Sequence, residues 1–284
     1  MVYGFVILHY LTDIDTCECI DSIFKKCQGK PFEVVVVDNF SNNGSIERIR
    51  NQFKDVTNVH ILYNAENLGF AKGNNVGYRY CREQLGCDTI IILNNDILIA
   101  SYNLFECIED DVQKYHPAVI GPDIESLIDG GHQNPMNITR DISRKSVQKD
   151  IVRYTFLSVI NRLGVYDLLL HFTGRHNGND KIPSSKDTRT QNKVQLHGSF
   201  MIFTSIFTQE MDVAFCPKTF MYMEESILYQ ICKARGMTML YDPKMIVYHK
   251  EDSATNALTA STKKKRDFVF KNIIKSSKVL LTYL

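Results

Sequence analysis

Short, uninterrupted apolar runs alternate with segments of helical periodicity over residues 1–120. The apolar runs, which are expected to be buried strands, are residues 2–8, 32–37, 59–63 and 89–93. The segments with a helical apolar stripe are residues 15–26, 45–53 and 74–85. Uninterrupted apolar strands separated by helices are typical of a mainly parallel sheet with helices on both faces. The alternation therefore predicts an α/β fold.

A cluster of polar residues follows each of these four strands. The clusters are residues 9–10, 38–41, 64–69 and 94–96. Ligands of such sheets bind at the carboxyl ends of the strands. Turn chemistry alone could explain any single cluster, because Asn and Asp favour turns. Four clusters in succession predict a shared crevice at one edge of the sheet.

Residues 126–193 interrupt the alternation with glycines and prolines and are expected to form an insertion. A helical apolar pattern over residues 151–172 predicts a helix within it. The insertion either covers one side of a binding site, where a second substrate would enter, or is a solvated linker, and the sequence leaves both open. Beyond it, we expect order over residues 195–207, a helix over residues 221–235 and short strands at 239–241 and 246–248.

Composition limits the partners and the compartment. The net charge of +1 gives no overall attraction to nucleic acid, and no nucleic-acid partner is expected. The eight cysteines are scattered without zinc-knuckle spacing, which predicts reduced, buried thiols in a cytoplasmic protein. We expect neither a signal peptide nor a membrane span, because the chain lacks both a basic start followed by an apolar run and an apolar stretch of about 18 residues.

Residues 263–284 form a basic tail with seven basic residues and one acidic residue. Its apolar residues can share one helical face, and they are Phe270, Ile273, Ile274, Leu280, Leu281 and Leu284. Lysines occupy another face. Such a helix either contacts an anionic membrane surface peripherally or packs on the domain or on a second subunit of a homodimer. The sequence does not choose between these alternatives.

Short motifs along the chain identify a family resemblance. They are residues 6–10, 34–45, 64–75, 91–96, 198–200, 220–225 and 243–249. Each motif is weak alone, but their order and spacing are specific. On these motifs the chain resembles glycosyltransferase family 2 and, within it, the rhamnosyltransferase-like branch. The resemblance implies a GT-A (nucleotide-diphospho-sugar transferase) fold over residues 1–260, including the insertion, with a helical tail at 261–284.

The resemblance assigns donor contacts to residues that follow the strands. Asp38 is expected to hydrogen-bond a pyrimidine base, although an Asx turn is the alternative explanation for this residue. Gly69 would let the backbone approach the nucleotide, and Asn67 and Lys72 would contact ribose or phosphate. A helix that starts near Asn74 would direct its N-terminus at the diphosphate. The remaining expected donor contacts are His9, Tyr10, Asn39, Phe70, Asn95 and Gly198.

The resemblance also implies a metal site for Mg²⁺ or Mn²⁺. Residues 94–96 occupy the place of the family's D-x-D motif, and Asp96 is the expected carboxylate ligand. A divalent ion there would neutralise the charge of the departing diphosphate. Asn94 departs from the acidic pattern, which predicts weaker metal binding. His249 is expected to join the metal or the diphosphate, with a purely structural histidine as the alternative.

The expected catalytic residues are Glu224 and Glu225, which open a late helix. In an inverting transfer the acceptor hydroxyl attacks the anomeric carbon and a carboxylate takes its proton. The family pattern implies that Glu225 is this base and that Glu224 holds the acceptor or orients the loop. Ile227 replaces a further acid of the family. The alternative is that both acids only complement the helix dipole.

Together these residues predict a metal-dependent, inverting glycosyltransferase. Its donor would be a UDP- or dTDP-sugar, with rhamnose suggested by the resemblance alone. Its acceptor would be a glycan or a lipid-linked glycan in cell-surface polysaccharide synthesis. A non-catalytic nucleotide-sugar-binding protein of the same fold is the alternative, because Asn94 and Ile227 depart from the acidic pattern. A nucleotidyltransferase is disfavoured, since residues 9–15 contain no Gly, Lys or Arg.

Overall fold

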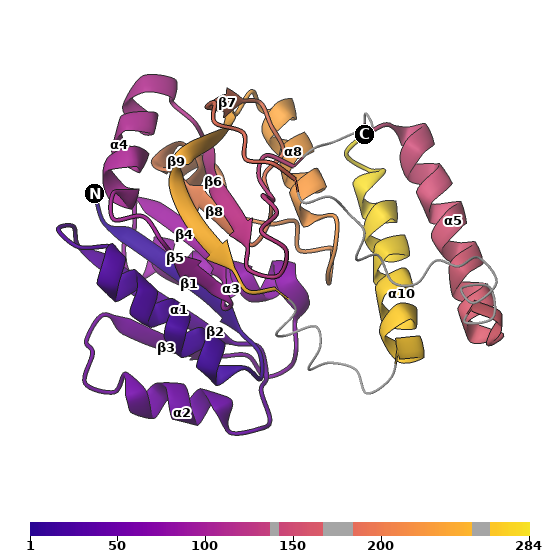
Figure 1. The fold of residues 1–284 in the computed structure, drawn as a ribbon, viewed down its shortest axis with the longest axis horizontal. Helices are drawn as coiled ribbons and strands as arrows, with labels where there is room; N and C mark the ends of the chain where they lie inside the picture. Colours follow the sequence, from indigo (N-terminus) through magenta and orange to yellow (C-terminus); the bar gives the residue numbers. More distant parts are fainter. Residues whose placement is uncertain (137–141, 167–183, 252–261) are drawn as a thin grey trace.

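The computed structural model describes residues 1–136, 142–166, 184–251 and 262–284 (Figure 1). Its strands are β1 (Tyr3–His9), β2 (Phe32–Asp38), β3 (Val59–Tyr63), β4 (Thr89–Asn94), β5 (Ile97–Ile99), β6 (Val119–Ser126), β7 (Gln191–Asn192), β8 (Phe200–Phe203) and β9 (Met239–His249). They form a sheet in the order β3-β2-β1-β4-β8-β6-β9-β5, with β7 beside β9.

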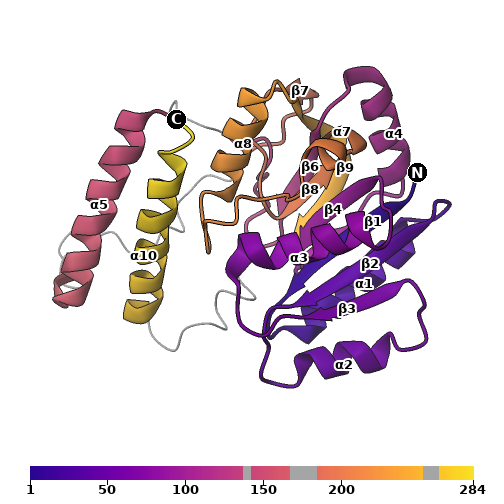
Figure 2. The same cartoon turned by 180° about the vertical axis from the view of Figure 1, so that it is seen from behind.

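Helices cover both faces of this sheet (Figures 1 and 2). The helices of the described residues are α1 (Asp13–Lys26), α2 (Ser45–Gln52), α3 (Gly69–Glu83), α4 (Leu104–Tyr115), α5 (Arg144–Arg162), α7 (Ser205–Glu210), α8 (Glu224–Ala234) and α10 (Thr262–Leu280), of which α5 and α10 lie beside the sheet rather than on a face of it (Figures 1 and 2). Alternate residues of the strands enter opposite cores. Phe5 and Ile7 of β1 pack with α1, α2 and α4, whereas Val6 packs with α3, α7 and α8. Burial on both faces explains the uninterrupted apolar runs.

The four strands predicted near the amino terminus are confirmed. β1 pairs in parallel with both β2 and β4, and β2 pairs in parallel with β3. Their carboxyl ends therefore meet at the same edge of the sheet, as the polar clusters predict. The predicted GT-A architecture, a mainly parallel sheet flanked by helices, is confirmed in this half of the sheet.

The carboxyl-terminal half of the sheet differs from the prediction. β8 runs antiparallel to β4 and β6, so the whole sheet is mixed. The two short strands expected at 239–241 and 246–248 are one strand, β9, whose pairing with β6 shifts register between Pro122 and Asp123. The sequence pattern does not predict β5, α4 or β6. Helix α3 begins at Gly69, five residues before the expected start.

The expected insertion contributes a long helix, α5. It begins at Arg144, earlier than predicted, because Ser143 and Ser146 form a capping box. The predicted helix extends to residue 172, but residues 167–172 lie outside the described part of the chain. Helix α5 packs beside α10 at one end of the molecule, and α10 lies between α5 and the sheet (Figures 1 and 2).

The tail forms the helix α10, and its apolar face is buried. Phe270, Ile273 and Leu280 are each less than a tenth exposed. Phe270 contacts Tyr154 of α5 at 5.8 Å between ring centroids. Of the two alternatives, the structure therefore shows packing on the domain. Membrane contact through the tail stays a prediction; in the structure this apolar face packs against α5 and α8. None of the helices within the described ranges is long and apolar enough to cross a bilayer.

Candidate active site

The polar strand ends converge on one cleft of about 440 Å³. Residues after β1, β2, β3 and β4 share its walls with residues from the later half of the chain. The lining residues are Leu8, Tyr10, Asn39, Asn67, Gly69, Phe70, Asn94, Asn95, Asp96, Gln133, His197, Phe220, Met221, Tyr222, Glu225, His249, Glu251 and Phe268. The cleft thus contains eight of the expected contacts as well as Glu225. It lies at the carboxyl edge of the parallel strands, where such folds bind ligands.

An amide network holds the loop that follows β3. Asn39 donates to Asn67 Oδ1 at 3.0 Å and accepts the Leu68 N–H at 3.0 Å. Asn67 Oδ1 also accepts the Gly69 N–H at 3.0 Å. These bonds fix the N-terminal end of α3 against the cleft. The loop is therefore a rigid wall rather than an open turn.

Gly69 fits a place that no other residue could occupy. Its φ is +77°, and a Cβ atom there would lie 2.3 Å from the carbonyl oxygen of Phe220. The next residue, Phe70, donates its N–H to that same oxygen at 2.7 Å. The backbone after β3 thus contacts the loop before α8 directly, and this contact closes one side of the cleft.

His9 does not contact the cleft, and its assignment as a donor contact is corrected. The ring is fully buried, and its two nitrogens are hydrogen-bonded to Thr16 Oγ1 and Ser45 Oγ, each at 2.8 Å. Burial lowers the pKa of His9 to about 4, so the ring is neutral. Its two hydrogen bonds connect α1 and α2 to the end of β1. Its neighbour Tyr10 lines the cleft.

Asp38 also lies behind the cleft wall. Its carboxylate accepts the Ser41 N–H at 3.1 Å, three residues along the chain and so one residue further than in an Asx turn. Burial raises the pKa of this carboxyl, while the hydrogen bonds from Ser41 oppose the shift. Lys72 is exposed on α3, and Asn74 is buried with its amide donated to the Phe70 carbonyl. These three residues are not in the cleft wall, and any donor contact by them stays a prediction.

Asp96 and His249 face each other within the cleft. Asp96 Oδ1 lies 3.3 Å from His249 Nε2, and both side chains are less than a tenth exposed. The other ring nitrogen of His249 is hydrogen-bonded to Gln133 Oε1 at 2.9 Å. That bond orients the imidazole, as partners of metal-bound histidines do. Asn95 instead donates from its amide to Thr12 Oγ1, just before α1, and to Thr16 Oγ1 of α1.

The carboxylate and the imidazole are suitable ligands for a divalent ion such as Mn²⁺. Within the described residues, no group of three or more His, Cys, Asp or Glu side chains is arranged to hold a metal. The protein therefore offers two ligands at this point, Asp96 and His249. An ion would complete its coordination with oxygens of a substrate, which fits a diphosphate.

Glu225 lies in the cleft wall at the start of α8. Two residues with positive φ, Tyr222 at 73° and Met223 at 69°, precede the helix and set the direction in which it starts. Burial raises the pKa of Glu225, opposed by hydrogen bonds from its own backbone and that of Gly198. Gly198 is needed for space, since a Cβ atom there would lie 2.5 Å from Glu225 Oε1.

Glu224 is not among the residues that line the cleft and is 3% exposed. Burial raises its pKa to about 8, and the adjacent charge of Glu225 adds to the shift. The two neighbouring acids thus have different environments. Glu224 holds its proton at neutral pH, whereas Glu225 reaches the cleft.

An aromatic wall on the other side of the cleft is not predicted by the sequence. Phe220 and Tyr222 come from the loop before α8, and Phe268 comes from α10. The Phe220 and Phe268 rings meet edge to face at 6.1 Å, and Ser276 of α10 donates to the Met221 carbonyl at 2.8 Å. Helix α10 is therefore part of the cleft. His197 and Gln133 also line the cleft, although the sequence assigns neither of them a role.

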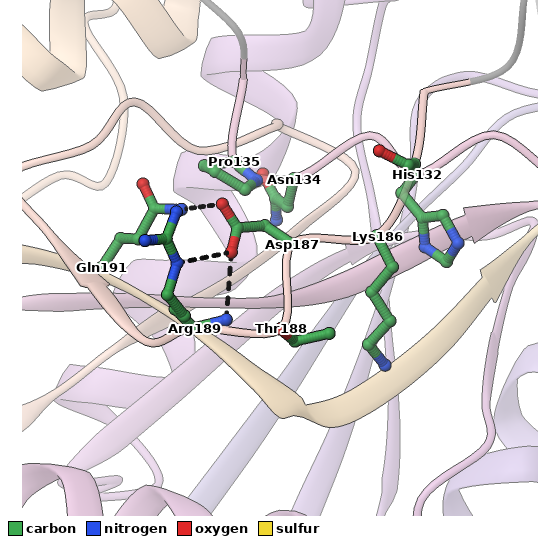
Figure 3. A pocket seen from close by; sticks show the side chains of 9 residues that line it. His132, Asn134, Pro135, Lys186, Asp187, Thr188, Arg189 and Gln191 are labelled. Carbon is green, nitrogen blue, oxygen red and sulfur yellow. Dashed lines mark hydrogen bonds and ion pairs between the residues drawn. The ribbon is translucent and has the colours of Figure 1, made fainter.

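Another, more polar pocket is lined by His132, Asn134, Pro135 and side chains of residues 185–191 (Figure 3). Its polar groups pair with one another, as Asp187 does with Gln191 and Arg189. The nearby buried Asp123 is hydrogen-bonded to His132 Nδ1 at 2.8 Å and forms an ion pair with Lys186 at 3.0 Å. Among the described residues that line this pocket, the only carboxylate is that of Asp187, which is already paired, so the Asp96 cleft is the better candidate.

Comparisons with known proteins agree with this choice of fold. The family model described as glycosyl transferase family 2 matches residues 15–169, more than half of the chain. The low-salt glycan biosynthesis hexosyltransferase Agl10 of Haloferax volcanii is 29% identical over 101 residues. That match covers 36% of this chain and 30% of the Haloferax protein, so the chain matches under a third of that relative's length.

Two solved structures show the same architecture over nearly the whole chain. Residues 1–349 of TarS from S. aureus, in complex with UDP, are 12% identical with a TM-score of 0.55, covering 96% of this chain and 71% of that one. GalNAc-T7 with UDP, GalNAc and Mn²⁺ is 13% identical with a TM-score of 0.59, covering 95% of this chain and 47% of that one. At such identities the likeness establishes the fold, and the GT-A prediction is confirmed.

Proposed function

Because this chain belongs to glycosyl transferase family 2, we propose that it transfers a sugar from a nucleotide-diphosphate donor to a hydroxyl of a glycan or lipid-linked acceptor. The observation that supports this most directly is the composition of one cleft. The Asp96–His249 pair and Glu225 line the same cavity, together with the loops that follow β2 and β3. One cleft could therefore bind the diphosphate leaving group beside Asp96 and His249 while Glu225 accepts the proton of the attacking hydroxyl.

The donor nucleotide fits the side of the cleft built by Tyr10, Asn39, Asn67 and Gly69. The amide network holds this wall rigid, which lowers the entropy lost when a nucleotide binds. The N-terminal end of α3 faces the same space, where a helix favours negative charge. We infer a UDP- or dTDP-sugar, as the sequence resemblance suggests.

Asp96 and His249 would hold Mg²⁺ or Mn²⁺ against the diphosphate. The ion, when bound, would neutralise the negative charge that grows on the leaving group. Gln133 keeps the imidazole in place through its bond to Nδ1. Asn94 lines the cleft where the family has a carboxylate. Affinity for the ion alone is therefore expected to be weak, with the donor supplying further ligands.

Glu225 would take the proton of the acceptor hydroxyl during an inverting displacement. Its side chain faces the cleft, and burial holds its pKa above the ordinary range for a carboxylate, which makes it a better base. The aromatic side chains Phe220, Tyr222 and Phe268 provide an apolar surface on which a sugar ring can pack. Glu224 stays behind the wall and supports the start of α8.

The finer assignments follow the sequence resemblance. We place the chain in the rhamnosyltransferase-like branch, in the cytoplasm, with a role in cell-surface polysaccharide synthesis. A panel of UDP- and dTDP-sugars, including a rhamnose donor, tests these points. Thermal shifts measured with and without Mn²⁺ identify the donor, because a ligand that binds the folded state raises the melting temperature.

Turnover separates catalysis from mere binding. The donor that gives the largest shift is incubated with Mn²⁺, and release of free nucleotide is followed with and without a glycan acceptor. Transfer or slow hydrolysis supports the proposal. A clear thermal shift without any turnover by that donor would instead support the non-catalytic binding protein. The exposed Glu210→Gln variant is a matched control for carboxylate substitutions and is expected to behave as the wild type.

A further inference from the structure

Helix α5 is apolar on two opposite faces. One face packs on α10 through residues such as Val147, Tyr154 and Ile160. The other face points away from the molecule and carries large apolar side chains. Val152 is 70%, Phe156 64%, Val159 50% and Leu163 72% exposed. An outer helix normally presents polar residues to water, so this second face is unusual.

The exposed apolar residues form one continuous stripe. Positions 152, 156, 159 and 163 follow the alternating spacing of four and three that keeps side chains on one side of a helix. Lys145 and Lys149 continue the stripe toward the N-terminal end of α5. A shallow hollow on this face is lined by Lys145, Gln148, Lys149, Val152, Arg153 and Phe156. The stripe therefore combines apolar side chains with a basic end.

Charge is distributed very unevenly between this end of the molecule and the rest. Of the 33 lysine and arginine residues in the chain, twelve lie on α5 and α10, but these helices hold only two of the 32 acidic residues. One of the two acids, Asp267, is paired with Arg162 at 3.2 Å. The α5–α10 pair is therefore strongly cationic, although the whole chain is nearly neutral.

We propose that the outer stripe of α5 docks on the surface of an anionic lipid bilayer. Apolar side chains at 152, 156, 159 and 163 would enter the boundary between headgroups and acyl chains, while the lysines meet lipid phosphates. A second copy of this chain is a poorer occupant, because two such faces would bring like charges together. The proposed membrane contact is thus made by α5 and not by the apolar face of α10, whose side chains pack against α5 and α8. The proposal does not depend on the enzymatic activity.

Vesicle flotation with the full chain tests the proposal. The vesicles contain phosphatidylcholine alone or phosphatidylcholine with phosphatidylglycerol. We expect binding to the anionic vesicles only, weakened when NaCl rises from about 0.1 M to about 0.5 M. Lys145→Gln and Lys149→Gln should each lower the partition coefficient about fivefold. Lys25→Gln and Lys54→Gln, at exposed positions elsewhere, are the matched controls and should not change it.

The apolar part of the stripe is tested with Phe156→Ser combined with Leu163→Ser. This pair should lower vesicle binding about tenfold or more without changing the melting temperature, because both side chains are largely exposed. Ile14→Ser on α1, where the side chain is 71% exposed, is the control. Equal binding to neutral vesicles, or unchanged binding by the double variant, would overturn the proposal. So would a wild-type dimer that the double variant converts to a monomer, with no vesicle binding by either.

Discussion

Asp96 and His249 face each other at 3.3 Å because β5 pairs antiparallel with β9 immediately beside them. Ile97, the residue after Asp96, stands opposite His249 in that register, and Lys250 donates its N–H to the Asp96 carbonyl at 3.1 Å. Two residues far apart in the sequence thus become a fixed pair. The strand register, rather than a flexible loop, determines the geometry of the candidate metal site.

Substituting either member of this pair should reduce turnover by about a hundredfold or more, since both would act on the same diphosphate charge. Asp96→Asn and His249→Ala are compared with the double variant under saturating Mn²⁺ and donor. The effects should be strongly non-additive, because either change disables the same ion site. Fully additive losses in the free-energy terms derived from kcat would show that the two residues act independently.

Gly198→Ala should impair catalysis more than folding. The added methyl would lie 2.5 Å from Glu225 Oε1, so the carboxylate must move to make room. We expect kcat to fall by about tenfold to a hundredfold, because small displacements of a catalytic group are costly. The melting temperature should change little, since the carboxylate end of the side chain is free to shift. A large loss of stability with normal kcat would contradict this explanation of Gly198.

Stability should depend on pH through Glu224, whose pKa is about 8 in the folded protein. Between its ordinary pKa near 4.5 and that value, the folded state keeps a proton that the unfolded state has lost. Stability therefore falls as pH rises through this window, by up to about 1.4 kcal/mol per pH unit from this group. The Glu224→Gln variant lacks this dependence.

Urea unfolding of the wild type and Glu224→Gln at pH values from about 5 to about 8 measures the effect. The free energy of unfolding of the variant should rise relative to that of the wild type as the pH increases. Glu210→Gln, an exposed control, should give a constant difference. Parallel pH profiles for wild type and Glu224→Gln would rule out a protonated Glu224.

Acid stability should be limited in part by His9. Its pKa is about 4 in the folded protein, below its ordinary value of 6.5, because burial disfavours the charged ring. The stability that the neutral ring contributes is present above pH 6.5 and is lost as pH falls through about 4. A His9→Gln variant should unfold at a lower urea concentration at pH 7 but show a shallower loss below pH 6.5. An unchanged slope below pH 6.5 would contradict a buried neutral ring.

The first half of the fold is predictable because its signals are local. Each parallel strand is an uninterrupted apolar run, and burial on both faces requires that pattern. The convergence of Asn39, Asn67 and Asp96 also follows, since parallel strands end at one edge. The sequence does not distinguish a polar residue at a strand end that lines a cleft from one that is buried and hydrogen-bonded within the protein. His9 is of the second kind, which is why it is misassigned.

The other wall of the cleft depends on contacts between distant parts of the chain. Phe268 of α10 meets Phe220 before α8, and Gln133 orients His249 from more than a hundred residues away. No local periodicity encodes such contacts. The tail pattern correctly predicts a helix, but its apolar face could equally have met lipid or protein. In the structure, one apolar side of α5 packs over the apolar face of α10.

The most direct test of the whole account is donor turnover by Glu225→Gln under conditions where the donor still binds. The amide of this variant has nearly the same size and the same position on the helix as the carboxylate, but it cannot take the proton of the acceptor's hydroxyl group. Thermal shifts by donor and Mn²⁺ should persist in this variant, while kcat for transfer should fall by about a hundredfold or more. Transfer at the wild-type rate by Glu225→Gln would contradict the role of Glu225 as the base.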